Sequence, residues 1–493
     1  MCIFDKLHEE CGVFGIFDYS NNADVISDSY NALYALQHRG QESCGIAINN
    51  DGVIQCHKDV GLVNEVFTQN QLEKLGEGNI AVAHARYATT GNKTRTNAQP
   101  MLVNHHKGTM ALAHNGNLVN AQELREELEM GGAIFHSTSD TEVIAYIITQ
   151  ERLRCNSIEE AVLATMKRIK GAYSLVIMSA QKLIAARDPK GFRPLCMGKR
   201  EDATVFASES CALDVLGAEL VRDIKPGEVV VVSQEGIKSL QFDEKHDSSL
   251  CVFEFIYFAR PDSIIEGSSV HKARLRAGAF LAQEHPVEAD LVIGVPDSGI
   301  DAAIGYSRES GIPYGIGLIK NKYIARTFIQ PGQKQRTNSV KIKLNAISHV
   351  IKGKRIVLVD DSVVRGTTSA RLVKILRDAG AKEVHMRLSS PPFMHPCYFG
   401  TDIDSRENLI AANYSLEEIK NILKVDSIGY LNVAALPHLA DNSKCGYCTG
   451  CFTGNYPVAP PANTEKLKFE QRLSNKMEKT IWYHNQKATK KQA

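Results

Sequence analysis

The stretch VLVDDSVVRGTTS, residues 357–369, decides the fold of the second half of this chain. An apolar run ends in two adjacent aspartates, and a turn rich in serine, glycine and threonine leads into a helical pattern over residues 367–379, which Gly380 can terminate. No polar residue interrupts the apolar run, as is typical of a strand buried on both faces. The stretch therefore predicts a strand–turn–helix unit of an α/β domain with a parallel sheet.

The turn in this stretch also predicts an anion site. Backbone N–H groups of a turn and a helix N-terminus bind phosphate readily, and the neighbouring carboxylates of Asp360 and Asp361 can hold ribose hydroxyls or Mg²⁺. A simple strand–turn–helix junction with capping residues is the alternative, but it does not account for two adjacent aspartates before such a turn. The hydroxyls that would join the cradle are those of Ser362, Thr367, Thr368 and Ser369.

Segments between about residues 252 and 400 extend the same pattern. The runs DLVIGV, RIVLVD and VHMRLS are nearly continuous apolar stretches separated by helical patterns, which predicts several parallel strands. The loop GVPDSG, residues 294–299, follows the first of these runs. Residues 320–345 are basic and polar with a Pro-Gly break, which favours a mobile lid over a polyanion. A plain solvated loop is the alternative for this last segment.

On these motifs the second half resembles the type I phosphoribosyltransferases. The resemblance implies a Rossmann-like parallel sheet that binds Mg²⁺ and phosphoribosyl pyrophosphate at the carboxyl ends of its strands. It implies one Mg²⁺ per subunit at Ser298, Asp360 and Asp361. The implied phosphoribosyl pyrophosphate site consists of Asp360, Asp361, Ser362, Arg365, Gly366, Thr367, Thr368 and Ser369.

The first half has a different texture. Between Cys11 and about Gln241, short β-like runs such as CGVFGIF, NIAVAHAR and YSLVIM are interrupted by helical patterns near residues 121–130 and 140–152, which predicts a sheet-rich α+β domain. Four motifs are weak singly but together resemble the glutaminase domain of the class II, N-terminal-nucleophile amidotransferases. They are QHRGQES (37–43), HARYATTG (84–91), AHNGN (113–117) and STSDTE (137–142). The implied fold is an αββα sandwich.

This second resemblance implies the residue roles of a glutaminase. Cys11 would be the nucleophile, activated by its own α-amino group, whose pKa of roughly 7.7 to 8.0 suits a general base. The side chain of Asn115 and the backbone N–H of Gly116 would form the oxyanion hole. Arg86, with Thr89 nearby, would bind the glutamine carboxylate, and Asp140 would pair with its α-amino group.

Cys2 competes with Cys11 for the role of nucleophile, because removal of Met1 would expose it. Cys11 is favoured, since the Gly-Val-Phe-Gly that follows it matches the family's opening strand. This choice predicts that residues 1–10 are a propeptide, cleaved between Glu10 and Cys11. The alternative is that Cys11 stays internal as a core thiol in a domain without activity.

The cysteine pattern raises the question of a metal cluster. Twelve cysteines in a chain this long are too few for a disulfide scaffold, so a group of them points to metal or catalysis. Spacing alone favours Cys445, Cys448 and Cys451 as iron–sulfur or zinc ligands. The resemblance to cluster-carrying glutamine phosphoribosyl pyrophosphate amidotransferases instead implies a structural [4Fe–4S] centre, with a zinc site as the alternative. The implied ligands are Cys251, Cys397, Cys448 and Cys451.

Composition limits the remaining possibilities. The chain has 493 residues, 43% of them hydrophobic, which suits two to four globular domains. The net charge of +1 gives no broad basic field for nucleic acid, and no stretch is apolar over the length of a bilayer, so we expect a soluble cytoplasmic protein with neither nucleic acid nor membrane as partner. The expected parts are a propeptide (1–10), a glutaminase domain (11–241), a phosphoribosyltransferase domain (252–400), a helical and Cys-rich segment (401–456) and a Lys-rich tail (457–493).

The combined resemblance, from Cys11 to about Tyr456, implies one glycosyltransferase that joins both halves. Such an enzyme forms 5-phosphoribosylamine from glutamine and phosphoribosyl pyrophosphate, releases glutamate and pyrophosphate, and opens purine biosynthesis. Purine nucleotides as feedback inhibitors and a homo-oligomer, a tetramer, are further expectations. Three alternatives fit less of the chain: an amidotransferase for another acceptor, a purine sensor that is not an enzyme, and a plain nucleobase phosphoribosyltransferase.

Overall fold

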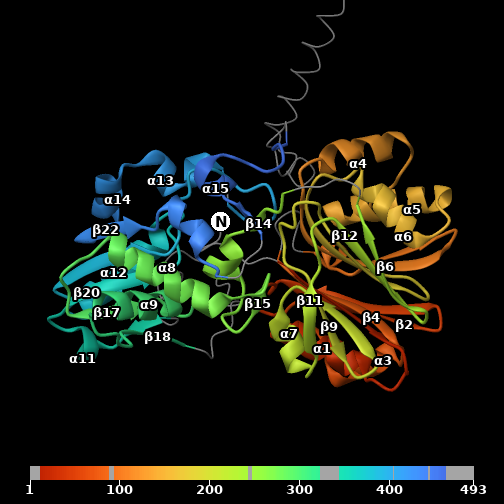
Figure 1. The fold of residues 1–493 in the computed structure, drawn as a ribbon, viewed down its shortest axis with the longest axis horizontal. Coiled ribbons are helices and arrows are strands. Elements are labelled where there is room, and N and C mark those ends of the chain that lie inside the picture. The colour runs from red at the N-terminus through yellow and green to blue at the C-terminus, as the bar shows by residue number, and fades with distance from the viewer. Residues whose placement is uncertain are drawn as a thin grey trace, which may run out of the picture.

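The computed structural model describes residues 11–87, 94–242, 247–321, 344–403, 405–441 and 445–461. Two lobes lie side by side, and the chain forms one lobe with its first half and the other with its second (Figure 1). The expected propeptide, most of the expected lid and most of the Lys-rich tail lie outside the described residues. Within those residues, no helix combines the length and the apolar character that a membrane crossing needs.

The first lobe contains two antiparallel sheets. One has the strand order β11-β9-β10-β1-β4-β2-β3, and the other has the order β13-β12-β8-β7-β6-β5. The first consists of β1 (Gly12–Asp18), β2 (Ser43–Asn50), β3 (Val53–Val60), β4 (Ile80–Arg86), β9 (Cys196–Arg200), β10 (Ala203–Ala207) and β11 (Glu219–Asp223). The second consists of β5 (Met101–His105), β6 (Gly108–Leu118), β7 (Gly171–Met178), β8 (Leu183–Arg187), β12 (Glu228–Ser233) and β13 (Gly236–Gln241).

The two sheets pack face to face, because alternate residues of their strands are apolar on the inner side. Val13 and Val82 of one sheet meet Ala113 and Val176 of the other in this inner layer. Helices cover both outer faces, which completes the expected αββα sandwich. They are α1 (Val25–Ala35), α2 (Val63–Val66), α3 (Gln69–Leu75) and α7 (Ser210–Val215) on the first sheet, and α4 (Ala121–Met130), α5 (Asp140–Arg154) and α6 (Ile158–Met166) on the second, with the short turn η1 (Arg95–Asn97).

The second lobe contains a parallel sheet with the order β17-β20-β21-β22. Val357 and Val359 of the central strand face one helical layer, while Ile356 and Leu358 face the other. The strands are β17 (Leu291–Gly294), β20 (Arg355–Asp360), β21 (Glu383–Leu388) and β22 (Ser427–Tyr430). The helices are α8 (Val270–Glu284), α9 (Ile300–Ser310), α11 (Ser348–Ile351), α12 (Thr367–Asp378), α13 (Ile410–Asn413) and α14 (Leu416–Leu423). The α/β fold expected for this half is confirmed.

Short elements complete the fold, and three of them carry a cysteine. Three two-stranded pairs are β14 (Leu250–Cys251) with β23 (Tyr447–Cys448), β15 (Ile264–Ile265) with β16 (Ser268–Ser269), and β18 (Leu318–Lys320) with β19 (Leu344–Ala346). The last pair brings together the two ends of the expected lid. The remaining elements are the π-helix η2 (Glu254–Phe258), the 3-10 turns η3 (Arg406–Asn408) and η4 (Val433–His438), and α15 (Gly450–Thr453).

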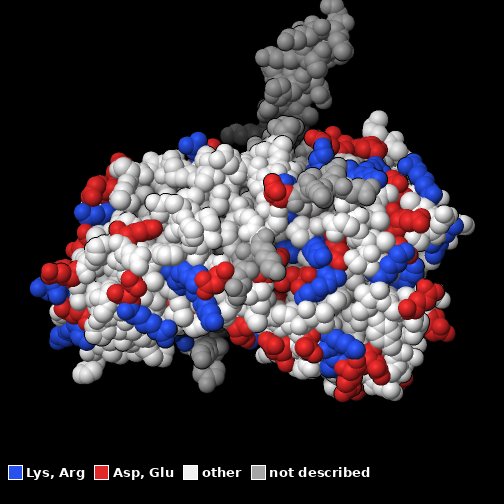
Figure 2. All heavy atoms as spheres, viewed as in Figure 1, with Lys and Arg blue, Asp and Glu red and all other residues white. Residues whose placement is uncertain are grey.

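Figure 2 shows basic and acidic side chains interspersed over the viewed face, as the near-zero net charge implies. Fewer charged side chains are visible on the upper part of the second lobe, in the area where Figure 1 places α13 and α15.

Candidate active sites

Cys11 lies at the start of β1, at the edge of the inner layer of the sandwich. Gly12 pairs with Ala85 of β4, so Arg86 lies at the end of the strand next to Cys11. The Cys11 thiol is 8% exposed, and its Sγ lies 3.4 Å from the carbonyl oxygen of Tyr87, to which it donates. The nucleophile predicted from the sequence is therefore placed beside the predicted carboxylate-binding arginine. Thr89 lies outside the described residues.

Asn115 and Gly116 lie on β6 of the second sheet, which contacts β4 of the first sheet. His84 Nε2 lies 3.0 Å from the carbonyl oxygen of His114, which joins β4 to β6 one residue before Asn115. Asn115 is 1% exposed, and within the described residues its Nδ2 has no hydrogen-bond partner. A buried donor without an acceptor costs about 1–3 kcal/mol, so such a group needs an explanation. An oxyanion that forms only during reaction supplies one.

Gly116 has a backbone that other residues do not adopt. Its φ is +143°, and a Cβ atom there would lie 2.1 Å from the carbonyl oxygen of Ala172. Only glycine therefore fits at this position of β6, where it pairs with Tyr173 of β7.

Asp140 is the first residue of α5 and is held in its ionised form. Burial alone would raise its pKa, but His114, the backbone N–H of Leu118 and the charge of Arg86 together lower it below the ordinary value. Its Oδ2 accepts from the Leu118 N–H at 3.0 Å, and its Oδ1 lies 3.6 Å from His114 Nδ1. The charge of Arg86 thus reaches the Asp140 carboxylate, which is expected of two residues that bind the two charged groups of one α-amino acid.

A buried ion cluster behind Cys11 was not predicted from the sequence. Arg39 Nε donates to the carbonyl oxygen of Cys11 at 3.0 Å, and the same guanidinium binds both carboxylate oxygens of Glu254 at 2.9 and 2.7 Å and one of Glu209 at 2.5 Å. Arg39, Glu209 and Glu254 are buried. The QHRG motif contains Arg39, but nothing local identifies Glu254, which lies 215 residues further along the chain.

The second candidate site lies at the carboxyl ends of β17 and β20. Asp360 ends β20, and Asp361 follows it. Ser298, in the loop after β17, donates its hydroxyl hydrogen to Asp361 Oδ1 at 2.5 Å, and Ser362 donates to Asp361 Oδ2 at 2.5 Å. The three residues predicted for Mg²⁺ therefore come together at one edge of the sheet, although 62 residues separate Ser298 from Asp360 in sequence (360 − 298).

The turn after Asp361 has the expected form of an anion cradle. Gly366 has φ +87°, and a Cβ atom there would lie 2.7 Å from Ile410 Cδ1, so glycine is required before α12 starts at Thr367. The hydroxyl residues predicted for phosphate occupy the turn and the first turn of this 12-residue helix. Arg365 is partly exposed beside them, Thr367 is exposed, and Ser369 is buried.

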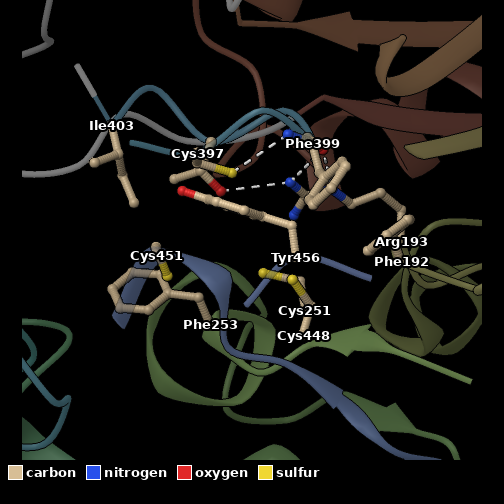
Figure 3. A pocket seen from close by; sticks show the side chains of 11 residues that line it. Phe192, Arg193, Cys251, Phe253, Cys397, Phe399, Ile403, Cys448, Cys451 and Tyr456 are labelled. Atoms are coloured by element: carbon tan, nitrogen blue, oxygen red, sulfur yellow. Dashed lines mark hydrogen bonds between the residues drawn. The ribbon is translucent and has the colours of Figure 1, made fainter. Parts of the chain in front are cut away.

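Four cysteines line one small cavity between the lobes (Figure 3). Cys251 and Cys448 are paired residues of β14 and β23, while Cys451 lies on α15. Burial raises the pKa of Cys448 to about 12 and that of Cys451 well above its ordinary value. Cys397 completes the lining, and Cys445 is not part of it. The cavity is also lined by Phe192, Arg193, Phe253, Phe399, Thr401, Ile403 and Tyr456.

The arrangement of these thiols bears on which metal they suit. Four cysteine thiols are the donor set of a structural zinc ion and of an iron–sulfur group alike, so the residues that line the cavity fit either one.

Comparison with known proteins finds relatives of both halves of the chain. A family model for the glutamine amidotransferase domain matches residues 84–215, and one for the phosphoribosyl transferase domain matches residues 268–389. The amidophosphoribosyltransferase of Synechocystis sp. is 49% identical over 468 residues, which cover 94% of this chain and 94% of that protein. That of Bacillus subtilis is 48% identical over 92% of this chain and 95% of its own length.

Solved structures give the same result. The glutamine phosphoribosylpyrophosphate amidotransferase of B. subtilis, solved with ADP and GMP, superimposes with a TM-score of 0.86 at 47% sequence identity, over 92% of this chain and 98% of that one. Similarity of this extent spans both lobes. The chain belongs to the amidophosphoribosyltransferase family.

Proposed function

We propose that the two sites act as one coupled enzyme, with the residue roles given below. As an amidophosphoribosyltransferase, the enzyme uses glutamine and phosphoribosyl pyrophosphate in the first step of purine biosynthesis. The observation that carries the assignment of roles is the buried Asn115 amide, which has no acceptor among the described residues. Asn115 lies on β6, and β6 contacts β4, the strand that ends at Arg86.

In the first lobe, Arg86 and Asp140 hold the carboxylate and the α-amino group of glutamine. The Cys11 thiol, after its proton passes to the α-amino group of the same residue, attacks the side-chain amide carbon. Asn115 Nδ2 and the Gly116 N–H donate to the oxygen that becomes negative in the tetrahedral intermediate. Collapse of the intermediate releases ammonia and leaves a thioester, which water hydrolyses to glutamate.

In the second lobe, the turn after Asp361 and the start of α12 hold the 5-phosphate of phosphoribosyl pyrophosphate. In this proposal Asp360 and Asp361 hold ribose hydroxyls and, with Ser298, would hold Mg²⁺. Two carboxylates with substrate oxygens and water suit Mg²⁺, which stabilises the negative charge of the departing pyrophosphate when bound. Ammonia then forms a bond to ribose C1 as the bond from C1 to pyrophosphate breaks.

Ammonia released in the first lobe has to reach the second without being protonated in water. The proposed solution is a channel that forms when residues 320–345 close over phosphoribosyl pyrophosphate. The paired strands β18 and β19 support this, because they hold the two ends of that segment together at the edge of the second lobe. Glutamine hydrolysis is then expected to accelerate when phosphoribosyl pyrophosphate is present.

A [4Fe–4S] cluster is proposed for the cavity of Cys251, Cys397, Cys448 and Cys451. The four thiolates would hold it as a clamp between β14, the segment after β21 and α15. Iron, sulfide and zinc analysis of anaerobically purified enzyme tests this. Four iron and four sulfide per chain are expected for this cluster, and one zinc without iron would contradict it.

Processing and regulation are proposed on the same basis. The free α-amino group required at Cys11 implies removal of residues 1–10, which intact-mass measurement detects.

Inhibition by purine nucleotides is supported by the B. subtilis relative, which was solved with ADP and GMP. A homo-oligomer, a tetramer, is proposed as well, and exposed Tyr414, just after α13, and Leu416, the first residue of α14, offer apolar surface for an interface. Light scattering of purified enzyme tests the assembly.

The substitution Asp361→Asn tests the division of labour between the lobes. It removes one carboxylate charge from the proposed Mg²⁺ and ribose site without changing the size of the side chain. Pyrophosphate release is expected to fall at least about tenfold with either glutamine or ammonia as nitrogen donor, since one lost charge contact is worth roughly 1.5–3 kcal/mol. Basal glutamine hydrolysis without phosphoribosyl pyrophosphate should persist. Unchanged pyrophosphate release would refute the site.

A further inference from the structure

The segment of residues 398–401, which follows Cys397, packs directly against the glutaminase strand β6. The side-chain Nδ2 of Asn117 donates to the carbonyl oxygen of Tyr398 at 3.0 Å. Gly400 lies against the Gly116 peptide so closely that a Cβ atom at Gly400 would be 3.4 Å from the Gly116 carbonyl carbon. Two residues of the second half of the chain thus contact the end of β6, the strand that contains the proposed oxyanion donors.

The same segment is held from its other side by Arg193, a fully buried arginine of the first lobe. Arg193 donates through Nε and Nη2 to the carbonyl oxygen of Phe399 at 3.2 and 2.8 Å, and its Nη2 also donates to Thr401 Oγ1 at 3.4 Å. The Arg193 carbonyl oxygen accepts from the Ser174 hydroxyl at 3.2 Å, and Ser174 pairs with Asn115 across β6 and β7. One arginine therefore ties the segment to the neighbour of Asn115.

Apolar packing fixes the segment further. The rings of Phe192 and Phe399 stack with centroids 4.3 Å apart, and Ala172, which pairs with Asn117, belongs to the same small core. Figure 3 shows Phe399 and Arg193 on the side of the cavity that faces the first lobe. The backbone N–H of Phe399 lies 3.4 Å from Cys397 Sγ, to which it donates. The cysteine cavity and β6 are thus separated by a single layer of residues.

We infer that Asn117 and Arg193 are positioning residues for the glutaminase reaction, which hold the C-terminal end of β6 in place by fastening it to residues 398–401. The inference rests on the proposed oxyanion role of Asn115 and Gly116 and extends it across the lobe boundary. The bond from Asn117 to Tyr398 and the close approach of Gly400 to the Gly116 peptide add to the pairing of Gly116 with Tyr173 of β7, and together they fix the Gly116 N–H. Glutamine hydrolysis in the first lobe then depends on a segment of the second.

The inference has a kinetic signature. An oxyanion forms only in the transition state, so a displaced donor lowers kcat while the ground-state affinity for glutamine changes little. Alkylation of a thiol by iodoacetamide forms no oxyanion and reports only on the nucleophile. Synthesis from free ammonia uses the second lobe and bypasses the glutaminase site.

The test uses Asn117→Ala, with Gly400→Ala as an approach from the second lobe, on the full holoenzyme. The expected result for both is a loss of about tenfold in kcat for glutamine hydrolysis, as for roughly 1.4 kcal/mol of lost stabilisation, with KM for glutamine within about twofold of wild type. The alkylation rate of Cys11, followed by peptide mass, and the ammonia-dependent rate should not change.

Asn120→Ala is the matched control, because the Asn120 side chain donates to Arg168 and accepts from Lys170 within the first lobe. The inference is overturned if Asn117→Ala and Gly400→Ala give the kcat of this control, or if Cys11 alkylation and ammonia-dependent synthesis fall together with kcat.

Asn115→Ala separates this failure from that of the proposed function. If Asn115→Ala leaves turnover intact, the oxyanion hole itself is wrong. If it lowers turnover and Asn117→Ala does not, only the present inference fails.

Discussion

At the scale of single residues, Asn115 stands out as a buried polar group. Its amide is buried at 1% exposure and has no acceptor within the described residues. Folding alone would favour an apolar side chain of similar size there, because an unpaired buried donor is destabilising. The proposed oxyanion role would account for this donor.

Replacement of Asn115 by alanine or aspartate should lower glutaminase kcat by roughly 10²–10³, with KM for glutamine nearly unchanged. Aspartate has the same shape as asparagine but no donor, so the pair separates loss of the hydrogen bond from loss of volume. Release of glutamate, measured at saturating glutamine, follows the reaction. Aspartate at wild-type turnover would contradict an oxyanion role.

Asp223 gives a pH-dependent prediction. Burial and the nearby Glu266 carboxylate raise its pKa to about 6, against about 3.9 for an ordinary aspartate. The folded state then binds this proton more tightly than the unfolded state, so its contribution to stability is present below about pH 4 and is lost as the pH rises through 6.

Asp223→Asn removes the charge that is unfavourable at high pH. We expect the melting temperature of the variant to exceed that of wild type at pH 7.5 and to approach it at pH 4.5, in thermal unfolding followed by circular dichroism. Asp202→Asn, at an exposed position, serves as the control. A difference that is equal at both pH values would show that the Asp223 carboxyl has an ordinary pKa.

Single residues also show what a sequence reveals about a site. Cys11, Arg86 and Asp140 could be assigned because each lies in a short motif with neighbours that belong to it. Arg193 and Glu254 could not, since their partners lie 206 and 215 residues away and any surface arginine or glutamate has the same local appearance.

At the scale of elements, the π-helix η2 connects the two lobes. Arg274 of α8 donates to the carbonyl oxygens of Phe255, Tyr257 and Ala259 at 2.9, 2.9 and 2.7 Å, which satisfies groups that a wide helical turn leaves open. Glu254 at the start of the turn binds Arg39 of the first lobe. A short irregular element is therefore held by buried charge from both sides.

Glu254→Gln should destabilise the protein by about 3–5 kcal/mol, because it leaves a buried arginine without its full countercharge. Urea unfolding measures the loss. Glu288→Gln is the control, since the Glu288 side chain is 95% exposed beside Arg355 and its ion pair contributes little. Equal stability of the two variants would mean that the Arg39 cluster is neutral to folding.

Elements differ in how far sequence alone predicts them. The unit of β20, turn and α12 follows from one continuous stretch, and its helix ends at Asp378, one residue before the expected end. The helical patterns at residues 121–130 and 140–152 likewise correspond to α4 and α5. Helices α1 and α6 were not predicted, although each buries apolar residues against a sheet, and β14 with β23 is too short to leave a periodic signal.

At the scale of the whole molecule, the two lobes depend on contacts that cross between them. The cysteine cavity takes its four cysteines from three distant parts of the chain, and spacing alone pointed to Cys445 in place of Cys251 and Cys397. Family resemblance supplied the set that lines the cavity. The fold class and the two half-reactions were predictable because each has its own local motifs, whereas the junction between the lobes is a product of tertiary packing.

The central claim is that Cys11 supplies nitrogen to a phosphoribosyl pyrophosphate site in the same chain. The most direct test measures pyrophosphate release from phosphoribosyl pyrophosphate by wild type and by Cys11→Ala, each with glutamine and with ammonia. We predict that Cys11→Ala loses glutamine-dependent release and keeps the ammonia-dependent rate of wild type. Glutamine-dependent release that survives in Cys11→Ala would contradict the account.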